Sequence, residues 1–302
     1  MTGNTAVRFI RIVKWASISI AVLMLLLLAW IKWTVAHFDT KTLPARHGQV
    51  DTVLYAREGG KRPLLVALGG SEGGNAWAND RWRKQRERFL DQGYAMLAVG
   101  YFGTPHSPEH LDRISLDGIH AAILKAAQDP RVDGRCIAVI GGSRGGELAL
   151  LLASHYPDIR AVVAIVPGSA VFPALTQAMN TPGFSFHDKP LPFVPVPWSA
   201  TPHLLVHDLR GAFDKMVANT AAMEAAAIPV ERINGAVYFV SASRDEFWPS
   251  QDMSDAMMAR LKQHGFTHPA EHLVVAGGHS EPLDEFPKME AFLKTNFAGT
   301  CR

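Results

Sequence analysis

The sequence is poor in cysteine, in net charge and in phosphate-binding motifs, and each shortage excludes a class of protein. Two cysteines, Cys136 and Cys301, are too few for a disulfide framework; we expect both to be unpaired and infer no redox compartment from them. A formal charge of +2 gives no long-range field that would attract nucleic acid or an acidic partner. Because neither G-x-G-x-x-G nor G-x-x-x-x-G-K-[ST] occurs, a phosphate-binding glycine loop is not expected.

Histidines at metal-like spacing are interrupted by residues that break helices. Pro108 lies between His106 and His110, and the series from His264 to His272 contains a glycine and a proline. We therefore expect no metal site and no cofactor. What the sequence does contain is 302 residues with 48% hydrophobic side chains, which is enough for one large α/β domain and an appendage.

A long uncharged segment near the N-terminus predicts a membrane span. Extended from residue 15 to residue 36, it covers the roughly 30 Å of a bilayer core in about 20 residues, after a cytoplasmic segment 1–14. The tryptophans that flank the span are Trp15, Trp30 and Trp33. The basic residues that precede it are Arg8, Arg11 and Lys14. These basic residues favour a periplasmic or extracellular catalytic domain, although Lys41 and Arg46 weaken the asymmetry. A cleaved signal peptide and a buried core helix are the alternatives to this single-pass anchor.

A glycine-crowded turn joins a strand pattern to a helix pattern and carries one serine. Residues 137–140 form a short apolar run rich in branched side chains, whereas the residues from Glu147 onward are typical of a helix. The turn 141–145 matches G-x-S-x-G, the nucleophile elbow, in which the glycines let strand and helix approach closely. Ser143 is therefore the candidate nucleophile, and the N–H of Arg144 is a candidate oxyanion donor. The alternative is that Ser143 only caps the helix.

Strand and helix patterns alternate through residues 63–302, after a polar tether and leading strand at 37–62. This alternation predicts a mostly parallel sheet with helices on both faces. The expected strands are 50–56, 64–68, 94–99, 137–140, 161–166, 237–240 and 273–276, and the expected helices include 77–92 and 114–128. The basic side chains of 77–92 are expected on a solvated face, with contact to anionic lipid headgroups as the alternative.

The segment 171–202 interrupts the alternation with prolines and aromatic residues. It predicts a cap that accepts an apolar acyl or aromatic group, or else a proline-braced surface loop. Phe184, Phe193 and Trp198 from this segment, together with Trp248, are the candidate substrate-binding residues.

The remaining catalytic groups are expected on loops that follow strands, in the order nucleophile, acid, histidine. Asp245 follows one strand and is the candidate acid, with Glu246 and Asp214 as alternatives. His279 follows the last strand and is the candidate base. The glycine loop 69–74 is expected to supply a second oxyanion N–H, unless it is a plain turn. The candidate donors in this loop are Ser71 and Glu72.

Residues 64–297 resemble the C-terminal catalytic domain shared by acyl-CoA thioesterases and bile acid-CoA:amino acid N-acyltransferases, within the α/β-hydrolases. The matching segments are Ile228 to Gly235, Asp245 with Trp248, Arg260 and Leu261 with His264 and Gly265, and Gly278 and His279 with Glu281 and Pro282. The resemblance implies a triad of Ser143, Asp245 and His279, with serine where some relatives use cysteine. A membrane segment and a short tether stand in place of the β-sandwich domain of the animal enzymes, which argues against transfer to glycine or taurine.

These observations predict a membrane-anchored serine hydrolase that cleaves an ester or thioester of an acyl group through an acyl-enzyme on Ser143. Its expected partners are a small-molecule substrate and the lipid bilayer. With the catalytic domain outside the cytoplasm, an ester, thioester or amide of an extracytoplasmic compound is a better expected substrate than a CoA ester. The alternatives are acyl transfer to an amine or alcohol, and a non-catalytic binding module on the same fold.

Overall fold

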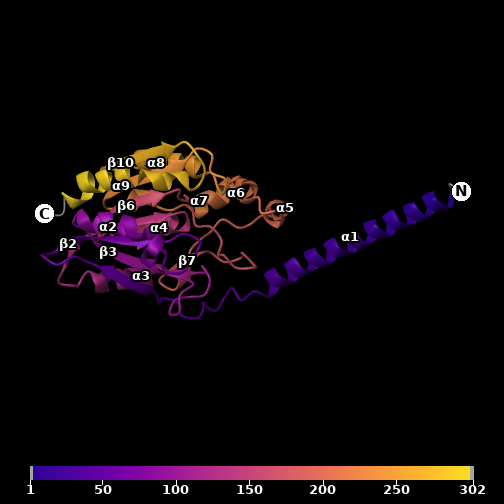
Figure 1. The fold of residues 1–302 in the computed structure, drawn as a ribbon, viewed down its shortest axis with the longest axis horizontal. Coiled ribbons are helices and arrows are strands. Elements are labelled where there is room, and N and C mark those ends of the chain that lie inside the picture. Colours follow the sequence, from indigo (N-terminus) through magenta and orange to yellow (C-terminus); the bar gives the residue numbers. More distant parts are fainter. Residues whose placement is uncertain (1–2, 300–302) are drawn as a thin grey trace.

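The computed structural model describes residues 3–299, and its central element is a seven-stranded sheet (Figure 1). The strands are β1 (Asp51–Tyr55), β2 (Arg62–Leu68), β3 (Ala95–Gly100), β5 (Val132–Gly142), β6 (Ile159–Ile165), β9 (Ala236–Ala242) and β10 (Ala270–Val275). Their order is β1-β3-β2-β5-β6-β9-β10, and only β1 is antiparallel to its neighbour. The predicted α/β architecture is confirmed.

Helices cover both faces of the sheet. They are α2 (Arg83–Asp91), α3 (Leu116–Ala126), α4 (Arg144–His155), α8 (Ser250–Gln263) and α9 (Phe286–Leu293). The apolar side chains of α3, α4 and α8 pack into one buried cluster, and those of α2 and α9 pack into another. Because nearly every residue of β2, β3, β6 and β9 is buried, the strands are continuous apolar runs, as expected of a parallel sheet between two helical layers.

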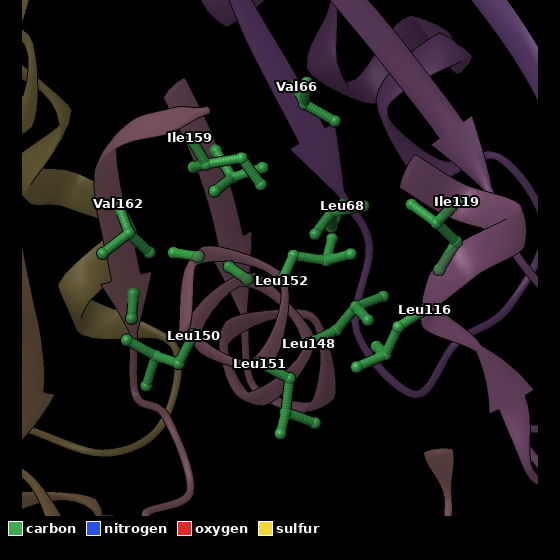
Figure 2. Close-up of a cluster of buried hydrophobic side chains, with 14 of the residues drawn as sticks. Val66, Leu68, Leu116, Ile119, Leu148, Leu150, Leu151, Leu152, Ile159 and Val162 are labelled. Carbon is green, nitrogen blue, oxygen red and sulfur yellow. The ribbon is translucent and has the colours of Figure 1, made fainter. Parts of the chain in front are cut away.

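The helix that begins beside Ser143 is held by a ring of leucines. Figure 2 shows these side chains lying among residues of β2, α3 and β6; the labelled residues are Val66, Leu68, Leu116, Ile119, Leu148, Leu150, Leu151, Leu152, Ile159 and Val162. Truncating one such buried leucine to alanine typically costs about 2–5 kcal/mol. The N-terminus of α4 is therefore firmly placed.

The helix predicted at 77–92 is broken into two 3₁₀ turns, Ala76–Ala78 and Asp80–Trp82, followed by α2. The break arises because Trp77 is buried and donates its indole N–H to the carbonyl of Leu68. Arg86 is buried as well, and its guanidinium donates to the carbonyls of Trp77 and Asn79. The prediction of a solvated basic face is therefore wrong for Arg86.

Between β6 and β9 the chain makes a long excursion, residues 166–235, which we call the insertion. It contains β7 (Phe184–Phe186), β8 (Lys189–Pro190), α5 (Thr201–Leu205), α6 (Leu209–Val217) and α7 (Thr220–Ala225), and β7 and β8 form a small sheet with β4 (Ile114–Ser115). It extends beyond the predicted cap-like segment 171–202, because α6 and α7 pack with Phe172 and Trp248 in a third apolar cluster.

The N-terminal helix α1 (Gly3–His37) extends away from the domain on the side where α5 lies (Figure 1). Residues Arg8–His37 are long and apolar enough to cross a membrane, and the most apolar window is 0% buried in the protein. The alternative of a buried core helix is therefore excluded. The tether after α1 is fastened to the domain: the buried Arg113 donates to the carbonyls of Asp39 and Thr42, at 3.2 and 2.9 Å.

Cys136, on β5, is disulfide-bonded. The prediction that it is unpaired is wrong, because the number of cysteines does not report which sulfur atoms meet in the folded chain. The other predicted unpaired cysteine, Cys301, lies outside the described residues.

Candidate active site

Ser143 lies in a strained turn between the end of β5 and the start of α4. Its backbone angles are φ 54° and ψ −121°, a conformation that non-glycine residues rarely adopt and that is held by the surrounding structure. Its N–H donates to the carbonyl of Ile165, and its carbonyl accepts from the N–H groups of Gly146 and Glu147. Its side chain makes no capping hydrogen bond, so the alternative role as a helix cap is not supported.

The two glycines of the G-x-S-x-G turn are required by close backbone contacts. A Cβ at Gly141 would overlap the carbonyl oxygen of Gly145, and a Cβ at Gly145 would overlap that of Gly69. At Gly142, by contrast, nothing lies within 4 Å of the Cβ position. The glycines at 141 and 145 therefore let β2, β5 and α4 approach, as the motif predicts.

His279 is held by a buried carboxylate. Its Nδ1 lies 2.8 and 2.9 Å from the two carboxylate oxygens of Asp245, which is 2% exposed. The N–H groups of Phe247 and Trp248 also donate to Asp245 Oδ1, at 3.0 and 3.3 Å. Burial acts to raise the pKa of Asp245, but the hydrogen bond and charge of His279, with the other donors, hold that pKa below its ordinary value. Asp245 is therefore ionised at neutral pH.

The two alternative acids have other contacts. The Glu246 carboxylate accepts the backbone N–H of His279 at 2.8 Å and so holds the loop rather than the imidazole. Asp214, on α6, pairs with the guanidinium of Arg210 at 2.8 Å. Arg210 also donates to the backbone carbonyl of Asp245 at 3.1 Å, which ties α6 to the catalytic loop.

Ser143 and His279 line one cavity of about 290 Å³, which we call the catalytic cavity. The glycine loop, including Ser71 and Glu72, forms another part of its wall. These groups meet because each follows the carboxyl end of a strand of the parallel sheet, where all such ends lie on the same edge. Within the described residues, no group of three or more potential ligand side chains is placed to hold a metal ion.

Tyr101 fixes the glycine loop, and sequence reasoning missed it. Its buried hydroxyl donates to the carbonyl of Gly69 at 2.7 Å and lies 3.3 Å from that of Gly70. Since the C=O and N–H of one peptide unit point in opposite directions, this contact turns the N–H of Ser71 away from Tyr101. Burial raises the pKa of Tyr101, so its hydroxyl keeps its proton and stays a donor. The only signal in the sequence was its position directly after a strand.

A buried ion pair lies directly behind Ser143. Arg144 Nη1 is 2.8 Å from Glu147 Oε2, and Glu147 Oε1 accepts the N–H of Phe172 at 3.1 Å. Arg144 Nη2 also donates to the carbonyls of Phe172 and Pro173. Burial raises the pKa of Glu147 to about 7, although the charge of Arg144 acts in the opposite direction. The first turn of α4 is thus joined to the beginning of the insertion.

The four aromatic residues predicted to bind substrate are not among the residues that line the catalytic cavity. Phe184 is buried in the core, 5.5 Å from the guanidinium of Arg144. Trp248 is also buried; its ring lies 6.2 Å from that of His279, and its indole N–H donates to the carbonyl of Val166. Phe193 and Trp198 line a separate groove beside α1.

The aromatic residues that do line the catalytic cavity are Trp77, Trp82 and Phe247. The ring of Phe247 lies 4.6 Å from the imidazole of His279 and is tilted against it by 45°, whereas Trp77 stacks on Trp82 at the same ring distance. Sequence reasoning placed the tryptophans on a helix and chose the neighbour of Phe247 instead. Nothing local in the sequence distinguishes Phe247 from Trp248.

A family model and curated proteins that match this chain both concern acyl-CoA thioester hydrolases. The family model for the C-terminal region of BAAT and acyl-CoA thioester hydrolases matches residues 119–299. The chain is 26% identical over 258 residues to the mitochondrial acyl-coenzyme A thioesterase 2 of Mus musculus, covering 83% of this chain and 52% of that protein. It is 26% identical over 252 residues to acyl-coenzyme A thioesterase 1 of Mus musculus, covering 83% and 56%. The chain thus spans about half the length of the curated relatives it matches.

Solved structures share the fold at low sequence identity. A puromycin-hydrolyzing peptidase of Mycobacterium tuberculosis superposes with a TM-score of 0.58 at 14% identity, covering 82% of this chain and 37% of that one. An esterase of Pyrococcus furiosus superposes with a TM-score of 0.53 at 16% identity, covering 78% and 84%. The chain therefore has the α/β-hydrolase fold and belongs to the BAAT and acyl-CoA thioester hydrolase C-terminal family.

Proposed function

We propose that the protein is a membrane-anchored serine hydrolase that cleaves an acyl thioester or ester through an acyl-enzyme on Ser143. The observation that carries the proposal is the shared cavity of Ser143 and His279, with Asp245 bonded to the far nitrogen of the imidazole. Asp245 fixes the tautomer with the proton on Nδ1, which leaves Nε2 free to act as a base.

In the first half of the reaction, His279 Nε2 takes the proton of the Ser143 hydroxyl as Ser143 Oγ attacks the acyl carbonyl carbon. The negative charge that develops on the carbonyl oxygen is stabilised by the N–H of Arg144, which lies in the first turn of α4 and has no partner within the helix. The N–H of Ser71 is our choice for the second donor, since Tyr101 turns it away from the core; that of Glu72 is the alternative. As the oxyanion collapses and the bond to the leaving sulfur or oxygen breaks, the protonated His279 gives its proton to that atom, and a thiol or alcohol departs.

In the second half, water enters the cavity and His279 removes one of its protons. The resulting hydroxide attacks the acyl-Ser143 carbonyl, the same donors hold the oxyanion, and Ser143 leaves with a proton returned by His279. The products are a carboxylic acid and the regenerated enzyme. Through both halves the Asp245 carboxylate stabilises the imidazolium without becoming protonated.

The relatives and the cavity wall support the proposed substrate class. The curated relatives are named acyl-coenzyme A thioesterases, which supports a thioester as the bond cleaved. The rings of Trp77, Trp82 and Phe247 offer an apolar surface to an acyl or aromatic group of the substrate. We therefore replace the predicted aromatic set of the insertion with these three residues.

We further propose that α1 anchors the protein and that the catalytic domain lies outside the cytoplasm. The basic residues before the span favour a cytoplasmic N-terminus. The disulfide at Cys136 is consistent with this orientation, since disulfides persist mainly in oxidising compartments. Digestion of right-side-out and inside-out vesicles with an external protease tests it: we expect the domain to be cleaved only in the right-side-out preparation, and the reverse pattern would contradict the orientation.

The hydrolase activity is tested with a fluorophosphonate probe and a panel of acyl esters and thioesters of increasing chain length. We expect the wild type to be labelled and active, and Ser143→Ala to lose both properties. Ser280→Ala is the matched control, because this serine also lines the cavity but lies outside the triad. Labelling that persists in Ser143→Ala would contradict the proposal. If an added amine or alcohol captures the acyl group in place of water, the enzyme is instead an acyltransferase.

A further inference from the structure

A second cavity, of about 420 Å³, lies between the insertion and the end of α1. Ile31 and Val35 of α1 form one wall. The other wall includes Phe193, Trp198 and Leu205 of the insertion. Among the residues that the structure describes, no charged side chain lines this space, which we call the α1 groove. An apolar groove without a charged group binds by burial of apolar surface, so its ligand is expected to be a hydrocarbon chain.

Apolar side chains next to the α1 groove are unusually exposed. Trp198 is 56% exposed, Leu205 is 50% exposed and Val206 is 73% exposed, and all three lie within residues 198–206. Each exposed apolar Å² left in water forfeits about 25 cal/mol, and contiguous patches of this kind mark contact surfaces. Since the residues of α1 are themselves exposed and apolar, this patch continues the surface of the helix.

The helix α1 gives the depth of this patch in a bilayer, a step that rests on the proposed membrane anchor. The uncharged stretch of α1 ends at Lys32, whose ammonium prefers the headgroup region, and Trp30 and Trp33 on either side prefer the same boundary. Ile31 and Val35, which line the groove, are about 6 Å apart along the helix and bracket that boundary. The groove therefore lies where acyl chains meet headgroups.

Two contacts fix the insertion at this height on α1. The side-chain amide of Asn180 donates to the backbone carbonyl of Val35 at 3.0 Å. The ammonium of Lys32 lies 5.8 Å from the centre of the Trp198 ring. Because one contact is to the helix backbone and the other is to the boundary lysine, the patch on the insertion is held at the depth of Lys32.

We propose that residues 198–206 enter the headgroup and acyl-chain boundary of the same bilayer, and that an acyl chain of a membrane lipid occupies the α1 groove. The bilayer that surrounds α1 is necessarily adjacent to this patch, whereas a protein partner would have to displace it. The ionisable groups beside the patch are of both signs: Lys32 faces the Trp198 ring, His203 lies against Asp208, and Arg210 pairs with Asp214. They therefore offer no pattern of one sign to a charged protein. The contact is therefore driven by apolar burial.

The inference is tested on the full chain in phosphatidylcholine vesicles, with an environment-sensitive fluorophore attached at Leu205→Cys. Brominated acyl chains quench a fluorophore that they touch. Leu25→Cys in the middle of α1 is the positive control for the anchor, and Val274→Cys, 41% exposed on β10, is the negative control. The signal of the wild-type chain taken through the same labelling is subtracted. Turnover of a soluble ester checks that each variant is folded.

We expect brominated lipid to quench the Leu205 probe at least about half as strongly as the Leu25 probe and to leave the Val274 probe unchanged. A probe at Thr201→Cys, which lines the groove, is expected to be quenched as well if a chain occupies it. Quenching at Leu25 but not at Leu205 would overturn the inference and leave the anchor standing. If the Leu25 probe is not quenched, both the proposed membrane anchor and the inference that depends on it are contradicted. If the Leu205 probe is quenched but the Thr201 probe is not, the proposal that an acyl chain occupies the α1 groove is contradicted.

Discussion

The catalytic cavity and the α1 groove are built in opposite ways. The catalytic cavity is formed by short loops that follow strands of a buried sheet, and it contains groups that can carry charge, among them Glu72, Arg81 and His279. The α1 groove is formed by an irregular insertion and a projecting helix, and none of the described residues in its wall carries a charged side chain. The first is suited to making and breaking bonds at fixed positions, and the second only to holding apolar matter.

This difference shows how the fold separates chemistry from recognition. The catalytic groups need a geometry accurate to a fraction of an ångström, which strand ends and buried donors supply. A hydrocarbon-binding surface needs area and the absence of charge, and an insertion rich in proline and aromatic residues can supply both. Changes at the catalytic cavity should therefore act on rate constants, whereas changes at the insertion should act on contact with lipid.

The largest expected effect comes from Asp245→Asn. The substitution keeps the size of the side chain but favours the wrong tautomer of His279, so we expect kcat to fall by about 10⁴. The measurement is kcat on a soluble chromogenic ester. Glu246→Gln is the control, because it removes only the charge beside the backbone N–H of His279. An equal loss in both variants would mean that the carboxylate acts through loop position rather than through the imidazole.

The next effect is on folding. Gly145→Ala forces a Cβ into the carbonyl oxygen of Gly69, and relief requires α4 to move from β2, so we expect a loss of about 3 kcal/mol or more in the free energy of unfolding. The measurement is urea unfolding. Gly142→Ala, one residue from Ser143, has free space and should change that free energy by less than about 1 kcal/mol. Similar losses in the two variants would show that the packing of the elbow is not the cause.

Removing the Tyr101 hydroxyl should weaken the proposed oxyanion site without abolishing it. In Tyr101→Phe the glycine loop loses its hydrogen bonds to the core, and we expect kcat to fall about 10-fold, equivalent to about 1.4 kcal/mol, with KM little changed. Tyr94→Phe is the matched control, since the buried Tyr94 hydroxyl has no hydrogen-bond partner within residues 3–299. A fall in stability alone, with kcat preserved, would contradict the role in positioning.

The smallest effect is a pH dependence of stability. The pKa of Glu147 is raised from 4.5 to about 7 in the folded chain, so the folded state binds a proton more tightly than the unfolded state does. This contribution is fully present below pH 4.5 and is lost as the pH rises through about 7. We expect Glu147→Gln to flatten that decline by up to about 1.4 kcal/mol per pH unit between pH 4.5 and 7, measured by urea unfolding at several pH values. An unchanged slope would show that Glu147 is ionised throughout.

Much of the catalytic cavity could be predicted because its parts follow local rules. The strand before Ser143, the two glycines around it, and the order of Asp245 and His279 are visible without any knowledge of packing. The sheet could be predicted for the same reason, since each buried strand is a short apolar run. The three side chains were expected to converge because parallel strands bring their carboxyl ends to one edge.

The remaining features depend on contacts between distant segments, which no local pattern reports. Tyr101 is directed at a loop about thirty residues earlier in the chain, and Arg86 is buried because Trp77 turns the chain before it. The aromatic residues of the insertion were expected to face the substrate, but Phe184 entered the core and Trp198 came to lie beside α1. A segment whose apolar residues follow neither the helical nor the strand period gives no information on which way its side chains point.

The fastening of the tether by Arg113 has a consequence for how the enzyme would meet its substrate. A domain on a loose linker samples many distances from the membrane, whereas Asp39 and Thr42 are held against the domain by a buried guanidinium. With α1 in a bilayer, the opening of the catalytic cavity would keep a constant distance from the membrane surface and a constant orientation relative to it. Encounters would then be set by lateral diffusion along a surface, and molecules that remain at that height would be favoured over those free in bulk water.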